Sequence, residues 1–162
     1  RDKDAIVATM ALCEAAAYYK TQDKTLWDAM IEMYEQFGYY KDAIQSVTMK
    51  GIEGLQKIQE IMNSLRQNPP AEFAGHKVVA VRDYKADTIK DLATGEVKAT
   101  GLPNSNVLYY ELTDDAWVCV RPSGTEPKVK FYYGVKGTSL ADADKKSEIM
   151  GKAVLDMVDS MK

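Results

Sequence analysis

The spacing of hydrophobic residues changes near residue 40. Before that point apolar residues recur at helical spacing. One face of residues 4–20 carries Ile6, Met10, Cys13 and Ala17, and one face of residues 26–37 carries Leu26, Met30, Met33 and Phe37. Thr25 followed by Asp28 is typical of a helix-capping box, and Gly38 is a typical helix stop. Residues 1–40 therefore predict a helical hairpin.

From residue 41 onward, short alternating segments appear between two helical ones. The pattern predicts strands at 44–50, 77–83, 108–112, 116–121 and 128–135, and loops over 84–105 with a short hairpin around Thr94-Gly95. Residues 67–75 contain two consecutive prolines and predict a connector. The order of strand, helix, several strands and helix predicts an α+β fold, with both helices on one face of an antiparallel or mixed sheet.

Two helical stripes are expected to cover that sheet. The helix that starts at Gly51 carries Ile52, Leu55, Ile58, Met62 and Leu65. The last helix is capped by Ser139 and carries Ala143, Ser147, Met150, Val154, Met157 and Met161. In the last strand the apolar residues Val129, Phe131, Tyr133 and Val135 alternate with Lys128, Lys130 and Tyr132, which predicts one buried and one open face.

Composition narrows the class of protein. A net charge of −3 argues against nucleic acid as the main partner. No apolar run is long enough to cross a membrane and the first residues are charged, so a cytoplasmic location is expected. Cys13 and Cys119 lie in apolar segments and are expected to be buried free thiols rather than a disulfide. His76, the single histidine, is expected at the surface and not in a zinc site or catalytic triad.

Candidate chemistry is concentrated in the stretch Arg121-Pro122-Ser123-Gly124-Thr125-Glu126-Pro127. A guanidinium can bind an oxyanion through two hydrogen bonds, and the Ser123 and Thr125 hydroxyls can add two more. Gly124 is expected to adopt a backbone angle that other residues resist, so that backbone N–H groups face the same anion. Lys130 adds positive charge on the outward face. The stretch predicts a phosphate-binding loop; the alternative is an ordinary turn closed by an Arg121–Glu126 pair.

The segment 121–132, Arg-Pro-Ser-Gly-Thr-Glu-Pro-Lys-Val-Lys-Phe-Tyr, resembles the phosphate-binding loop of the α-D-phosphohexomutases, the family of phosphoglucomutases, phosphomannomutases and phosphoglucosamine mutases. The resemblance extends over the chain. Residues 1–40 resemble the C-terminal helices of the third, α/β domain of these enzymes. Residues 41–162 resemble their fourth domain, which has a TATA-binding-protein-like fold.

The resemblance implies a four-domain isomerase that moves phosphate between the 1-position and the 5- or 6-position of a sugar. A phosphoserine, a Mg²⁺ ion and a sugar bisphosphate act in the other domains, while the fourth grips the non-reacting phosphate and closes the cleft. By this resemblance Arg121, Ser123, Gly124 and Thr125 bind that phosphate, with Lys130 as a further contact. No catalytic or metal-binding residue is expected in this chain.

The sequence lacks the family's Ser-His-Asn-Pro nucleophile loop, its aspartate-rich metal-binding loop and its Gly-Glu-x-Ser-Gly sugar loop; the isolated Asp-x-Asp triplets at residues 2–4 and 142–144 are not such a loop. We therefore expect a C-terminal fragment, inactive alone, whose partners are a phosphosugar and the missing N-terminal domains. Glucose phosphate is the expected substrate, and mannose, pentose and glucosamine phosphates are alternatives. A free-standing phospholigand-binding module is a second hypothesis. Nucleic-acid binding, suggested by the topology alone, conflicts with the charge.

Overall fold

The computed structural model describes residues 3–49, 51–124 and 126–161. The chain divides into two compact units, Arg1–Tyr39 and Tyr40–Lys162. The first unit holds two helices, α1 (Ala5–Lys20) and α2 (Leu26–Phe37). The predicted capping box at the start of α2 is confirmed, because the Asp28 N–H donates to the Thr25 hydroxyl and the Thr25 N–H donates to the Asp28 carboxylate. Gly38 ends this helix with a φ of 113°.

The first unit does not bury its apolar stripes. Every residue of α1 and α2 is described, and none is buried. Ile6 and Met10, for example, are 76% and 67% exposed. The expectation of a buried thiol at Cys13 is wrong, since this residue is exposed. A pair of helices alone offers each apolar face too little partner surface to cover it.

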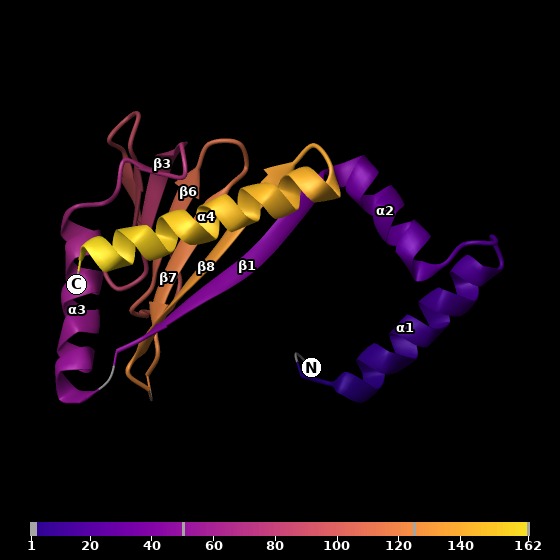
Figure 1. Ribbon diagram of the computed structural model, residues 1–162, viewed down its shortest axis with the longest axis horizontal. Coiled ribbons are helices and arrows are strands. Elements are labelled where there is room, and N and C mark those ends of the chain that lie inside the picture. Colours follow the sequence, from indigo (N-terminus) through magenta and orange to yellow (C-terminus); the bar gives the residue numbers. More distant parts are fainter. Residues whose placement is uncertain (1–2, 50, 125, 162) are drawn as a thin grey trace. The chain divides into compact units, whose positions relative to one another are not determined.

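The second unit combines one β-sheet with helices that pack on it (Figure 1). In chain order its elements are β1 (Tyr39–Thr48), α3 (Gly51–Gln67), β2 (Glu72–Phe73), β3 (His76–Asp83), β4 (Thr88–Asp91), β5 (Val97–Lys98), β6 (Leu108–Leu112), β7 (Trp117–Pro122), β8 (Lys128–Gly137) and α4 (Leu140–Ser160). The strands form one sheet in the order β1-β8-β7-β6-β3-β4-β5, and β2 pairs with β3. The pairs from β2 to β8 whose register is defined are antiparallel. The predicted α+β fold preceded by a helical hairpin is confirmed.

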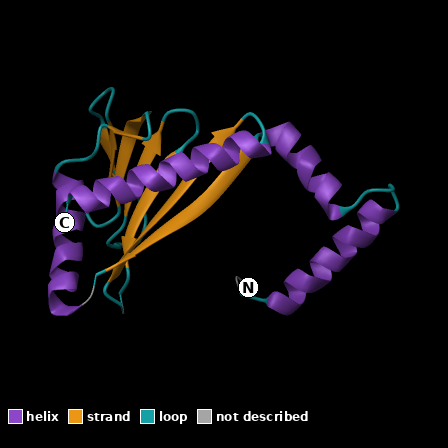
Figure 2. Ribbon diagram, in the orientation of Figure 1, coloured by secondary structure: helices purple, strands orange, loops and turns teal. Residues whose placement is uncertain are grey.

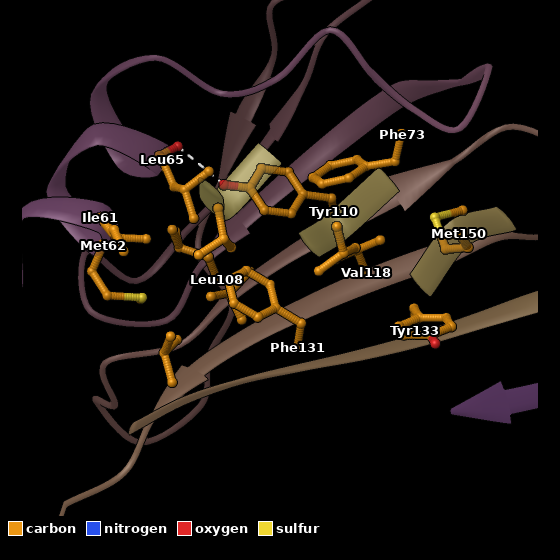
Figure 3. Close-up of a cluster of buried hydrophobic side chains, with 14 of the residues drawn as sticks. Ile61, Met62, Leu65, Phe73, Leu108, Tyr110, Val118, Phe131, Tyr133 and Met150 are labelled. Atoms are coloured by element: carbon orange, nitrogen blue, oxygen red, sulfur yellow. Dashed lines mark hydrogen bonds between the residues drawn. The ribbon is translucent and has the colours of Figure 1, made fainter. Parts of the chain in front are cut away.

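Helices α3 and α4 pack on the same face of this sheet (Figures 1 and 2). The core lies between these helices and the sheet (Figure 3). It is built from the alternating residues of β6, β7 and β8, from Ile58, Ile61, Met62 and Leu65 of α3, and from Met150, Val154 and Val158 of α4. Its largest fully buried side chains include Tyr110, Phe131, Ile61, Met62, Leu65, Leu108 and Met150. The alternation in β8 is confirmed, because Val129, Phe131, Tyr133 and Val135 are buried while Lys128, Lys130 and Tyr132 are only partly covered.

One buried hydrogen bond replaces a helical bond that the proline shortly after the end of α3 cannot make. In a continuing helix the carbonyl of Leu65 would accept the N–H of residue 69, but that residue is Pro69 and has no N–H. The Tyr110 hydroxyl donates to the Leu65 carbonyl instead, at 3.0 Å (Figure 3). Nearby, the Arg66 Nε donates to the Asp83 carboxylate at 2.7 Å, and its Nη2 donates to the Asn106 side chain at 2.8 Å. These contacts attach the C-terminal end of α3 to the sheet.

Several local expectations need correction. β1 begins at Tyr39 rather than at residue 44, and the predicted strand end at Lys50 lies outside the described residues. The 67–75 connector contains β2, because positive φ angles at Ala74 and Gly75 form a tight turn that pairs Phe73 with His76. In the predicted apolar stripe of α3, Leu55 is 51% exposed, and the side chain of Ile52 lies outside the described part of the structure. His76 was expected at the surface, but it belongs to β3 and its side chain is largely covered, with its Nδ1 3.0 Å from the Asp114 carboxylate.

Candidate phosphate-binding site

The predicted motif begins in the last two residues of β7 and continues through the β7–β8 loop, at one end of the sheet. The two strands pair antiparallel, with Arg121 opposite Lys130 and Pro122 opposite Val129. The Ser123 N–H donates to the Lys128 carbonyl at 2.8 Å and closes the loop. The loop is also joined to the end of β1, where the Met49 N–H donates to the Pro127 carbonyl at 2.8 Å.

Two cations, Arg121 and Lys130, face each other across the strands at this end of the sheet. Among the described residues, neither the Arg121 guanidinium nor the Lys130 ammonium has a carboxylate within ion-pair distance. Glu126 pairs instead with Lys128, whose Nζ lies 2.7 Å from its Oε2, and this contact lowers the pKa of Glu126. The alternative of a turn closed by an Arg121–Glu126 pair is therefore not what the loop adopts. Like charges directly opposite each other across two strands destabilise a sheet, and a bound anion would remove that cost.

A cavity of about 380 Å³ opens over this pair of cations. It is lined by Arg121, Pro122, Ser123, Gly124, Lys130 and Tyr132. Four of the five predicted site residues thus lie around one hollow, while the fifth, Thr125, lies outside the described residues. The Ser123 hydroxyl accepts the N–H of Glu126 at 3.3 Å, which orients its oxygen within the loop.

The expected role of Gly124 is wrong in one respect. Its φ is not in the left-handed region, and a Cβ added there would meet no atom within 4 Å. Backbone strain therefore does not require glycine at this position. The absence of a side chain instead leaves the Gly124 backbone open to the cavity.

Sequence reasoning did not select Tyr132 as a site residue, although it lines the cavity. The signal was available, because Tyr132 follows Lys130 by two residues and so shares its face of β8. Cys119 lies opposite Tyr132 and is only partly covered, not buried as expected. Its pKa is raised, chiefly by burial, against the opposing effect of the nearby Arg121 charge.

No group of three or more His, Cys, Asp or Glu side chains in the described part of the chain is arranged to hold a metal ion. Within the same residues, none of the helices is both long enough and apolar enough to span a bilayer.

The family described as phosphoglucomutase/phosphomannomutase, C-terminal domain, matches residues 61–151, which is more than half of the chain and includes the β7–β8 loop. The chain belongs to this family. The phosphoglucomutases of Staphylococcus aureus strains MRSA252 and USA300 are each 37% identical to it over 150 residues. Those residues are 93% of this chain and 27% of each relative, so the chain spans about a quarter of the length of these phosphoglucomutases.

The fold of this mutase C-terminal domain is also seen in a solved structure. The crystal structure of pp63/parafusin, an exocytosis-sensitive phosphoprotein and phosphoglucomutase from Paramecium, matches with a TM-score of 0.55. The match has 17% sequence identity and covers 99% of this chain and 28% of that one. At this identity the likeness concerns the fold. Family membership rests on the sequence matches.

Proposed function

We propose that this chain supplies the phosphate grip of a phosphosugar mutase, holding the substrate phosphate that does not react. The observation that carries the proposal is the pair of directly opposed cations, Arg121 and Lys130, over a cavity and without carboxylate partners among the described residues. The Arg121 guanidinium would bind two phosphate oxygens, and the Lys130 ammonium would neutralise the remaining charge. The hydroxyls of Ser123 and Thr125 and the open Gly124 backbone would complete the contact.

In this proposal the parent reaction is the interconversion of glucose 1-phosphate and glucose 6-phosphate, because the two relatives described above are phosphoglucomutases. Mannose, pentose and glucosamine phosphates remain alternative substrates. Residues 1–40 would be the C-terminal helices of the third mutase domain, and residues 41–162 the domain that closes the cleft. The phosphoserine and the Mg²⁺ that the family resemblance implies would belong to protein outside this chain. The 162-residue chain alone is expected to have no mutase activity.

A titration of the ¹⁵N-labelled chain with glucose 6-phosphate tests whether these residues bind the phosphate. We expect the amide resonances of Ser123, Gly124 and Lys130 to shift together. Replacing Arg121 by alanine should weaken binding about 10- to 100-fold, the range for losing charge-assisted hydrogen bonds. Arg121→Lys keeps the charge but loses the forked geometry, so its affinity should fall between those of the parent and the alanine variant.

Lys98→Ala is the matched control, since it removes one positive charge from β5 at the other edge of the same sheet. Its affinity should stay close to that of the parent. Two results would refute the proposal: no shift at tens of millimolar ligand, or equal affinities in the parent and in Arg121→Ala.

A further inference from the structure

The sheet face opposite the helices carries a second hollow that continues from the phosphate-binding cavity. It has a volume of about 490 Å³ and is lined by Ser105, Val107, Tyr109, Trp117, Cys119, Arg121 and Tyr132. Arg121 and Tyr132 line both hollows, so the two are contiguous. A ligand held by its phosphate at Arg121 therefore has room to extend over Tyr132 into the second hollow.

Two stacked aromatic rings, those of Tyr109 and Trp117, line the second hollow and are called the aromatic floor below. Tyr109 and Trp117 stack across β6 and β7, with ring centroids 5.5 Å apart and planes 12° from parallel. The Arg82 guanidinium lies 5.5 Å from the centre of the Tyr109 ring and is paired with Glu111. The Trp117 indole lies so close over Gly134 that a Cβ there would be 2.2 Å from its Nε1. These groups hold one another in place.

Tyr132 differs from those aromatic residues. Among the described residues its ring stacks on no other ring, and its hydroxyl has no hydrogen-bond partner. It is only partly covered, and it stands between the phosphate cavity and the aromatic floor. A tyrosine offers an apolar ring face and a polar tip, which together suit a ligand that is neither fully apolar nor fully polar.

The spacing along the strands suits a phosphorylated sugar. Arg121 and Lys130 form one cross-strand row, and Cys119 and Tyr132 form the next row on the same face. Successive rows on one face of a sheet are about 7 Å apart. A pyranose ring joined to its phosphate through one methylene and one oxygen spans a step of that size. The ring presents C–H groups to an aromatic face and hydroxyls at its edge to a phenol.

Resting on the proposed phosphate grip, we infer that Tyr132 is a substrate-contacting residue. Its ring packs against the carbon skeleton of the bound sugar phosphate, with Cys119 beside it, and its hydroxyl bonds a sugar hydroxyl. This chain would then recognise part of the sugar as well as its phosphate.

Paired titrations of the 162-residue chain separate recognition of the sugar from binding of the phosphate. Glucose 6-phosphate and inorganic phosphate are titrated against the parent, Tyr132→Ala and Tyr132→Phe. We expect Tyr132→Ala to bind glucose 6-phosphate about 3- to 10-fold more weakly, from an aromatic contact of ordinary strength, and to bind inorganic phosphate within about twofold of the parent. Tyr132→Phe keeps the ring and should lose only part of that affinity. Tyr18→Ala, which removes an exposed tyrosine of α1, should change neither affinity.

A direct readout accompanies the affinities. In the parent, nuclear Overhauser effects should connect the Tyr132 ring protons with sugar protons of bound glucose 6-phosphate. The inference is overturned if Tyr132→Ala binds both ligands like the parent, or weakens both equally. In either case binding that still depends on Arg121 leaves the phosphate grip intact. Failure of the parent to bind either ligand overturns the grip itself.

Discussion

Removing the Tyr110 hydroxyl tests how α3 is terminated. Tyr110→Phe keeps the buried ring but deletes the donor to the Leu65 carbonyl, whose usual helical partner is replaced by Pro69. Leu65 and Tyr110 are both 0% exposed, so water cannot replace the lost bond without opening the core. A buried acceptor left without a donor costs about 1–3 kcal/mol. We expect the free energy of unfolding of the second unit to fall by about 2 kcal/mol.

Urea unfolding followed by tryptophan fluorescence measures this loss. The chain has one tryptophan in each unit, Trp27 in α2 and Trp117 in β7, so a Trp27→Phe background makes the signal specific to the second unit. Tyr18→Phe in the same background is the matched control, because that side chain is 62% exposed. A loss below about 0.5 kcal/mol in Tyr110→Phe would show that the hydroxyl does not terminate α3 as described.

The same pair of proteins predicts a pH dependence. The pKa of Tyr110 is raised above its ordinary value, chiefly by burial. The folded protein therefore keeps this proton after the unfolded chain begins to release it near pH 10, so the folded state is progressively disfavoured as the pH rises past 10. The phenylalanine variant lacks this group. The difference in stability between the two proteins should thus be constant below pH 9 and should shrink above pH 10; a constant difference up to pH 11 would contradict it.

Two further substitutions test contacts at the two ends of α3. Gly54→Ala should lower the free energy of unfolding by about 1–2 kcal/mol, because the new Cβ would lie 2.1 Å from the Met49 carbonyl oxygen and this clash outweighs the gain in helix propensity. The control is Gln56→Ala at an exposed position of the same helix, which should change the free energy of unfolding by less than about 0.5 kcal/mol. Equal stability of the two variants would refute the clash. Asp83→Asn should cost about 2 kcal/mol in the same urea assay, because it leaves the part-buried Arg66 without a carboxylate. Glu96→Gln, which disrupts an exposed pair with Lys98, is its control and should be nearly neutral.

Alternation along the strands predicted the parts of the fold that matter most for the site. The period of two in β8 placed Phe131 in the core and Lys130 and Tyr132 on the open face, and the structure agrees. The motif was likewise placed correctly, at the end of one strand and in the loop that leads to the next. Such patterns are reliable because reversing them would bury charge and expose the core.

Other features could not be predicted from the pattern. An apolar stripe shows which face of a helix can be covered but not what covers it, so Cys13 was expected to be buried and is exposed. β2 has two residues and no measurable period, and it exists because the turn at Ala74 and Gly75 folds Phe73 back onto β3. At Gly124 the residue type suggested a strained backbone, whereas what matters there is the missing side chain. The position of Tyr132 was predictable, but its place between two hollows depends on loop residues far away in the sequence.

The order of strands in the sheet has a consequence for how this unit folds. β1 is the first strand of the unit along the chain, yet its neighbour in the sheet is β8, the last one. From Thr48 to Lys128 the chain runs for about 80 residues, and closing so long a loop is entropically unfavourable and slow. During synthesis β1 leaves the ribosome long before its partner exists. The β3–β4 and β6–β7–β8 hairpins can form locally first, so β1 is expected to join the sheet last and to stay an unpaired edge until then.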